Sequence, residues 1–263
     1  MSIDRVSDPV QARERSTAPA ARRRLATTPG AAHETRVRPA LDRGAVTAYL
    51  ARAARSLRRH RGLLDRLDAS LGDGDHGENM ATGFDAVLQA LAEEPASDLG
   101  ALLRNVGHVL VARVGGASGP LYGTAFIEAG FTVGSVAHLD PAAITDAFDA
   151  AVRGLSRRGR CAVGDKTILD ALAPAAGAFR AAVEAGESLE TSLRRAAWAA
   201  HSGMRATTPL VARRGLALRL GERSRGHQDP GATSCFLLVR TMLAAPRDHA
   251  RPAALHAAAG GCA

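Results

Sequence analysis

Apolar residues recur at three- and four-residue steps through most of this chain, while aromatic residues make up only 3% of it. The recurrence is typical of amphipathic helices. The shortage of aromatic residues means that a core must be built mainly from Ala, Leu and Val, which favours closely packed helices over a sheet. Eight helical segments are expected, at residues 41–64, 80–91, 98–111, 120–131, 140–155, 167–185, 189–205 and 232–243.

Polar residues at the starts of several segments support these ranges. Asp98 stands where an N-cap is expected, and Asp140-Pro141 and Asp229-Pro230 have the order typical of a helix start. No alternating β pattern of comparable length occurs. The sequence therefore predicts an all-α fold, a bundle or closed ring of eight antiparallel amphipathic helices.

Charge and composition divide the chain into three parts. Residues 1–40 hold eight arginines against four acidic residues and have no sustained helical period, so we expect a disordered, Arg-rich N-terminal extension. Residues 41–246 are expected to form the helical domain, with a flexible tail at residues 247–263. The arginines of the extension are not interleaved with aromatic residues, so nucleic acid is not expected as a partner.

The expected compartment is the cytoplasm. No run of residues approaches the roughly 18 apolar residues of a membrane span, so a membrane partner is not expected. The N-terminus lacks the apolar segment of a secretory signal. Cys161, Cys235 and Cys262 are scattered and form no C-x-x-C pair, which indicates reduced thiols.

The segment LDASLGDGDHGENM, residues 67–80, concentrates oxygen ligands. Asp68, Asp73 and Asp75 are spaced by glycines that allow tight turns, and three crowded carboxylates repel one another unless a cation lies between them. Mg²⁺ prefers such oxygens at about 2.1 Å and is usually shared with a phosphate. An acidic surface turn is the alternative. His76 is a candidate zinc ligand or general base, but a phosphate or hydroxyl contact is favoured because no cysteine or second histidine is nearby in sequence.

Three more glycine-rich segments stand at helix starts. They are VGGASGPLYG at residues 114–123, RGRCAVGDKT at 158–167 and GERSRGHQDPGATS at 221–234. Glycines let backbone N–H groups approach a ligand, and the partial positive charge of a helix N-terminus suits phosphate. Alternate junctions of an up-and-down bundle lie at the same end, so the four segments are predicted to converge there. P-loop and Rossmann patterns are absent.

The four segments resemble motifs of the nucleotide-binding (L) subunit of dihydroxyacetone kinase. The matching patterns are LDxxxGDGDHGxNM, GGASGPLYGxxF, RGxxxxGDKTxxD and GERSxGHQDPGATS, which occur in the family's order within residues 41–245. The resemblance implies a barrel of eight antiparallel helices with the nucleotide at one end. It also implies that Asp68, Asp73 and Asp75 hold two Mg²⁺ ions that bridge the phosphates of ADP or ATP.

The resemblance further implies a set of nucleotide contacts, while no side chain is assigned as catalytic. The implied contacts are His76, Gly77, Glu78, Asn79, Ala117, Ser118, Gly159, Ile168, Leu216, Asp229, Pro230 and Gly231. Lys166, the only lysine of the chain, and Thr167 are expected to shape their loop, the lysine by pairing with an acidic neighbour.

By the same resemblance, the chain is a phosphotransferase subunit that acts on dihydroxyacetone, or a related keto-sugar, held on a separate K subunit. The reaction is phosphoryl transfer by positioning and charge neutralisation. Two donors are open: ATP that exchanges with ADP, and a phosphotransferase-system protein (the M subunit) that rephosphorylates bound ADP. Whether the chain forms a homodimer is also open.

One position departs from the family pattern in a way that bears on activity. The family reads G-R-A-S-Y-L-G-E-R where this chain has GLALRLGER, so Leu216 replaces an arginine expected beside the phosphates. Losing that donor is expected to weaken phosphate binding or transition-state stabilisation by about 10- to 1000-fold unless Arg213, Arg214 or Arg219 substitutes for it. Ile168, where methionine is usual, is a mild change.

Two rival classes follow from the same motifs. An ADP-binding regulator of a transcription factor would suit a catalytically weak form with Leu216. The ATP-binding domain of a fatty-acid kinase has the related loop DGDTGTNM, and His76 in place of its threonine argues against that class.

Overall fold

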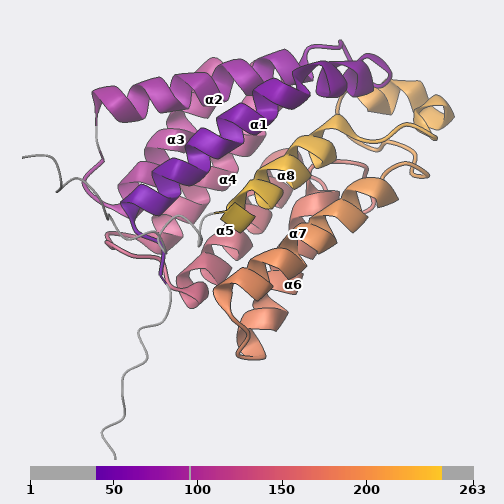
Figure 1. Cartoon of the computed structure of the whole chain (residues 1–263). Coiled ribbons are helices and arrows are strands. Elements are labelled where there is room, and N and C mark those ends of the chain that lie inside the picture. The colour runs from indigo at the N-terminus through magenta and orange to yellow at the C-terminus, as the bar shows by residue number, and fades with distance from the viewer. Residues whose placement is uncertain (1–39, 95, 245–263) are drawn as a thin grey trace, which may run out of the picture. The chain divides into compact units, whose positions relative to one another are not determined.

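The computed structural model describes residues 40–94 and 96–244, and these residues form an all-helical fold (Figure 1). Within them there is no strand, only an isolated antiparallel bridge between Leu41 and Leu139. The all-α prediction is confirmed. The elements are α1 (Arg43–Ala69), α2 (His76–Glu93), α3 (Leu99–Arg113), α4 (Ser118–Val133), α5 (Pro141–Gly159), α6 (Leu169–Glu184), α7 (Leu189–Ala206), η1 (Leu216–Ser224), α8 (Pro230–Thr241) and η2 (Met242–Ala244), where η marks a 3₁₀-helix. The expectations for residues 1–39 and 247–263 lie outside the described part.

The eight α-helices pack as a closed ring. Each helix packs against the next one in the chain, and α8 packs against α1 as well as against α7. Figure 1 shows α8 lying between α1 and α7. A ring closed in this way places every second inter-helix junction at the same end, which is the arrangement that the order of the motifs predicted.

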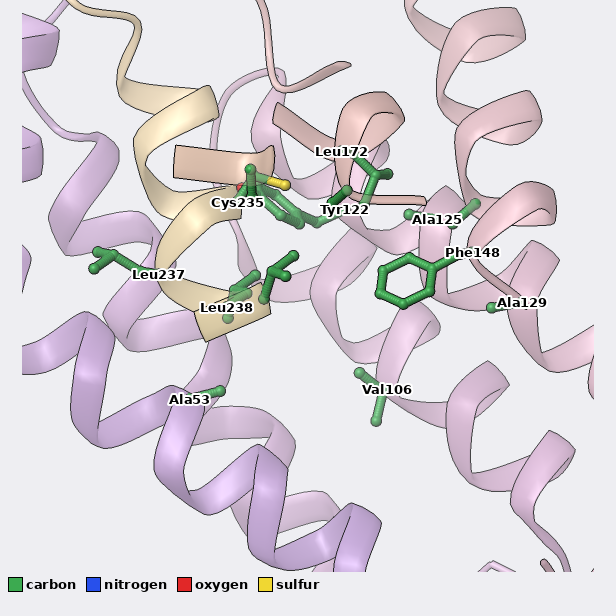
Figure 2. Close-up of a cluster of buried hydrophobic side chains, with 14 of the residues drawn as sticks. Ala53, Val106, Tyr122, Ala125, Ala129, Phe148, Leu172, Cys235, Leu237 and Leu238 are labelled. Atoms are coloured by element: carbon green, nitrogen blue, oxygen red, sulfur yellow. The ribbon is translucent and has the colours of Figure 1, made fainter. Parts of the chain in front are cut away.

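The interior of the ring is built from small and branched apolar residues with a few aromatic rings. Figure 2 shows Tyr122, Phe148 and Cys235 among the alanines, leucines and valines of this core. The ring also contains a partly open apolar cavity of about 160 Å³, which Tyr49 and Tyr122 both line. The predicted core of Ala, Leu and Val is confirmed.

Aspartates fix the starts of half of the α-helices. Each one accepts a hydrogen bond from the backbone N–H three residues further on, which is the usual N-cap geometry. These caps are Asp42, Asp98, Asp140 and Asp229, at distances of 2.9, 2.7, 2.8 and 2.6 Å.

Two reciprocal pairs of glycines bring α3 and α4 into close contact. A Cβ atom at Gly107 would lie 2.6 Å from the carbonyl oxygen of Gly123, and a Cβ at Gly123 would lie 2.7 Å from that of Gly107. Gly100 and Gly130 face each other in the same way, with 2.7 Å in both directions. Because a larger residue at these positions would require a helix to shift, the glycines allow the short distance between the two helices.

The helix bounds beside the aspartate segment differ from the sequence prediction. Helix α1 continues to Ala69, so Asp68 lies in its last turn, and α2 already begins at His76 instead of residue 80. The connecting loop is therefore short, and η1 was not predicted at all. None of the helices in the described ranges is long and apolar enough to cross a membrane.

Candidate functional site

The four glycine-rich segments meet at one end of the ring around a pocket of about 360 Å³. This volume lies within the usual range of small-molecule sites. We call it the four-loop pocket. Its wall comprises Asp68, Leu71, Gly72, Asp73, Asp75, His76, Asn79, Gly115, Gly116, Ala117, Ser118, Pro120, Leu121, Tyr122, Arg158, Gly159, Cys161, Lys166, Thr167, Ile168, Arg214, Gly215, Leu216, Ala217, Asp229, Pro230 and Gly231.

Three carboxylates gather in this pocket. One oxygen each from Asp68, Asp73 and Asp75 can be chosen so that all three lie within 4.8 Å of one another. Asp68 is partly buried, whereas Asp73 and Asp75 are exposed. Burial, together with the neighbouring Asp73 carboxylate, raises the pKa of Asp68, although bonds from backbone N–H groups oppose the shift. A hard divalent cation fits this donor set because it would neutralise the repulsion between the carboxylates.

The Asp68 side chain also shapes the loop that carries the other two aspartates. Its Oδ2 atom accepts the backbone N–H groups of Gly74, Asp75 and His76 at 2.9, 3.1 and 3.3 Å. Gly74 has φ +84°, a conformation that favours glycine. The carboxylate in the last turn of α1 thus folds the loop back and sets the start of α2.

His76 is buried between two hydroxyl groups. Its Nδ1 lies 3.0 Å from Ser118 Oγ, and its Nε2 lies 2.8 Å from Ser234 Oγ. Burial lowers the pKa of His76 to about 4, so the ring is neutral near pH 7. Since both ring nitrogens have hydrogen-bond partners, the geometry favours a hydrogen-bonding role over the zinc-ligand role considered from the sequence.

Lys166 is buried and joins three segments of the chain. Its Nζ donates to the carbonyl oxygen of Thr207 at 2.7 Å and also to the carbonyl oxygen of His227. The expected pairing with an acidic neighbour is wrong as a direct contact, because Asp170 and Asp229 act on its pKa only through their nearby charges. Burial lowers the pKa of Lys166. The lysine therefore holds the 164–167 loop against the segments that precede α8.

Asp170 and Asp229 organise the backbone around Lys166. Asp170 accepts the N–H groups of Gly164 at 2.6 Å and of Thr167 at 2.7 Å, which orders the GDKT loop. Asp229 caps α8, and burial raises the pKa of Asp229 to about 7. Both carboxylates therefore order the backbone around Lys166 by accepting hydrogen bonds from N–H groups.

Most of the nucleotide contacts implied by the sequence line the four-loop pocket. They are His76, Asn79, Ala117, Ser118, Gly159, Ile168, Leu216, Asp229, Pro230 and Gly231. Gly77 and Glu78 do not line it. A Cβ at Gly77 would lie 2.1 Å from the carbonyl oxygen of Arg61, and Glu78 Oε2 lies 2.6 Å from Arg61 Nε. These two residues join α2 to α1.

The pocket wall also includes the cationic side chains of Arg214, which the sequence offered as one of three candidates, and of Arg158, which it did not single out. Of the three arginines considered as substitutes at position 216, only Arg214 lines the pocket. Its Nε donates to the carbonyl oxygen of Arg160 at 2.5 Å and lies 3.6 Å from Asp165 Oδ2. Arg158 also lines the pocket and is exposed. Its place just before Gly159 in the RGxxxxGDKT pattern was the only sequence signal for it.

Comparison with known proteins identifies the family. The DAK2 domain model matches residues 70–244. The ADP-binding subunit DhaL of the PEP-dependent dihydroxyacetone kinase of Escherichia coli is 36% identical over 208 residues, covering 79% of this chain and 99% of that protein. The D-erythrulose kinase of Mycolicibacterium smegmatis is 38% identical over 185 residues, covering 68% of this chain and 31% of that protein.

A solved structure shows the same fold. The crystal structure of the dihydroxyacetone kinase of C. freundii in complex with AMP-PNP and Mg²⁺ matches with a TM-score of 0.61 at 23% identity, covering 84% of this chain and 37% of that one. The fold is thus the helical fold found in a kinase. The chain belongs to the DAK2 domain family, a family of kinase subunits and domains.

Proposed function

We propose that this protein is the Mg-nucleotide subunit of a dihydroxyacetone-type kinase. In this role it passes a phosphoryl group to a keto-sugar held on a separate K subunit. The observation that carries the proposal is the cluster of Asp68, Asp73 and Asp75, whose oxygens lie within 4.8 Å of one another in a pocket built from four loops. Its relation to an ADP-binding kinase subunit, almost all of which aligns with this chain, supports ADP as the resident nucleotide.

The pocket offers three kinds of group to a charged ligand: carboxylates for metal ions, backbone N–H groups and an arginine. Asp68, Asp73 and Asp75 would hold Mg²⁺, two ions by our proposal, which would offset the negative charge of the transferring phosphoryl group. The backbone N–H groups at the starts of α2, α4 and α8 supply partial positive charge. Arg214 adds a full positive charge at the pocket wall. This set of groups suits phosphoryl transfer by positioning, which needs little covalent chemistry from the protein.

The keto-sugar and the phosphoryl donor are separate questions. Relatives include subunits or domains of kinases named for dihydroxyacetone and for D-erythrulose. A short keto-sugar is therefore the substrate class, and its identity depends on the partner that binds it. The relative named PEP-dependent favours a relay through a phosphotransferase-system M subunit over exchange with ATP.

Native mass spectrometry of the purified chain, followed by nucleotide analysis after denaturation, tests the proposal. We expect ADP with two Mg²⁺ ions on the wild-type protein. Asp73→Ala should lose the nucleotide because the metal ions become under-ligated. Asp146→Ala is the matched control, since Asp146 is an exposed aspartate of α5 outside the pocket. Tight ADP binding by Asp73→Ala would disprove the site assignment.

A second candidate function is an ADP-binding regulator of a transcription factor, and one residue favours it. Leu216 stands at the pocket wall, 46% exposed, where the family pattern has arginine. A nucleotide that is bound but not turned over would suit such a regulator. Reconstitution with K and M subunits distinguishes the two functions: turnover favours the kinase, and bound ADP without turnover favours the regulator.

A further inference from the structure

A chain of hydrogen bonds runs from the interior of the helical ring to the four-loop pocket. Tyr122 Oη lies 2.7 Å from Ser234 Oγ, and Ser234 Oγ lies 2.8 Å from His76 Nε2. His76 Nδ1 lies 3.0 Å from Ser118 Oγ. Tyr122, His76 and Ser234 are buried, whereas Ser118, the first residue of α4, is partly exposed. His76, Ser118 and Tyr122 all line the pocket, and Ser234 lies behind them. The chain therefore links α2, α4 and α8.

Tyr122 is the inner end of this chain. Its ring lies in the apolar core beside Leu172 and Cys235 (Figure 2), and it also lines the apolar cavity of the ring. Its hydroxyl has two neighbouring acceptors, Ser234 Oγ and the carbonyl oxygen of Gly231 at 3.2 Å. Ser234 Oγ also lies 3.0 Å from the carbonyl oxygen of Gly231.

Counting the protons of these four side chains gives two arrangements, and the carbonyl oxygen of Pro230 is a further acceptor near His76. A neutral imidazole carries one N–H, so one ring nitrogen of His76 donates and the other accepts. In the first arrangement Ser118 donates to Nδ1, Nε2–H donates to Ser234, and Ser234 donates either to the carbonyl oxygen of Gly231 or to Tyr122. In the second, Tyr122 donates to Ser234, Ser234 donates to Nε2, and Nδ1–H donates to Ser118.

An anionic ligand in the pocket distinguishes the two arrangements. Phosphate oxygens only accept hydrogen bonds, so the Ser118 hydroxyl must donate to the ligand to bind it. It then has no proton for Nδ1, and Nδ1 must carry the proton itself. Only the second arrangement meets this condition. In it every hydroxyl of the chain donates toward the pocket, and each bond polarises the next.

We propose that Tyr122 and Ser234 are positioning residues of the four-loop pocket, which hold His76 in the Nδ1–H tautomer so that Ser118 donates to a bound phosphate. This inference rests on the proposed nucleotide site. It assigns a role to Tyr122 and Ser234, which the motifs place near the site without giving them any part in binding.

The tautomer of His76 tests the proposal directly. Protein labelled with ¹⁵N-histidine would be examined by two-bond ¹H–¹⁵N NMR with ADP and Mg²⁺, and His76→Gln would assign the signals. We expect the signature of the Nδ1–H tautomer in the complex. The Nε2–H tautomer in a complex that binds ADP would overturn the relay while leaving the nucleotide site intact. Wild-type protein that binds no ADP would overturn the relay and the proposed function together.

The two tyrosines of the chain provide a matched pair of variants. Tyr49 and Tyr122 line the same apolar cavity, but only Tyr122 bonds to Ser234. Tyr122→Phe is expected to weaken ADP binding by about twofold to tenfold, the range for one lost hydrogen bond. It should also shift the Nε2 signal of His76. Tyr49→Phe should change neither quantity.

A folded Tyr122→Phe variant with wild-type affinity and an unshifted His76 signal would show that Tyr122 has no positioning role. Circular dichroism and the Tm report whether each variant folds. Should Tyr122→Phe fail to fold, the tautomer of the wild-type complex still decides for or against the relay.

Discussion

The carboxylate of Asp68 accepts the backbone N–H of Gly74 at 2.9 Å, across a gap of six residues in the chain. This bond closes the aspartate loop on the last turn of α1. Asp68 is thus both a candidate metal ligand and the side chain that gives the loop its shape, whereas Asp73 and Asp75 are exposed side chains on that loop.

The double role of Asp68 predicts different consequences for two alanine variants. Asp68→Ala should lower the free energy of unfolding by about 1–3 kcal/mol even without metal, because three backbone N–H groups lose their acceptor. Asp73→Ala should leave the metal-free stability within about 0.5 kcal/mol of wild type. Urea unfolding in EDTA measures both changes. Equal stability of the two variants would contradict the loop-shaping role of Asp68.

The contact between α3 and α4 predicts that Gly107→Ala is destabilising. The added Cβ would lie 2.6 Å from the Gly123 carbonyl oxygen, so one helix must shift. Overpacking of this kind costs about 1–3 kcal/mol. Gly177→Ala is the control, because Gly177 lies inside α6 and a Cβ added there would meet no atom within 4 Å. That change should stabilise the protein by up to about 1 kcal/mol through helix propensity.

Thermal unfolding of the two glycine variants separates crowding from helix propensity. Crowding between α3 and α4 should lower the Tm of Gly107→Ala. Helix propensity alone should raise the Tm of Gly177→Ala. A rise in Tm for both variants would mean that α3 and α4 can separate slightly without loss.

The sequence was sufficient for the number and order of the helices but not for all of their ends. The period of apolar residues is a local property, and it identified all eight α-helices. The ends beside the aspartate segment were wrong because the glycines there indicated a longer loop. The side chain of Asp68 instead holds Gly74, Asp75 and His76 in place, which brings the start of α2 forward to His76.

The position of the candidate site followed from the order of the motifs, whereas the partners of individual side chains did not. Lys166 contacts carbonyl oxygens 41 and 61 residues away, at Thr207 and His227. Any residue offers a backbone carbonyl, so no residue type in the sequence marks such a partner. The link from Tyr122 to Ser234 spans 112 residues and depends on how α4 and α8 pack.

The buried carboxyl of Asp229 predicts a dependence of stability on pH. Burial raises the pKa of Asp229 from 3.8 to about 7 in the folded protein, so between these values the folded state holds a proton that the unfolded state has lost. Its contribution to stability is complete below pH 3.8 and is lost as the pH rises through 7. Asp229→Asn keeps a side-chain oxygen for the cap and cannot titrate.

Urea unfolding of the metal-free protein from pH 4 to 8 measures this dependence. The free energy of unfolding of wild type, relative to that of Asp229→Asn, should fall as the pH rises to about 7 and then level off. A constant difference between the two proteins would show that Asp229 is already ionised at the lower pH.

The variants Leu216→Arg and Arg214→Ala should change phosphate binding in opposite directions, since both residues line the pocket. Leu216→Arg should strengthen ADP binding or raise turnover with a K subunit by about tenfold or more, because a guanidinium gains charge-assisted bonds to phosphate. Arg214→Ala should weaken ADP binding, and more strongly than Arg213→Ala, because Arg213 does not line the pocket. Isothermal titration of each variant with ADP and Mg²⁺ measures these changes. If Arg214→Ala and Arg213→Ala bind alike, Arg214 is not the substitute for the missing arginine, and the charge on the phosphates is left to the metal ions and the helix N-termini.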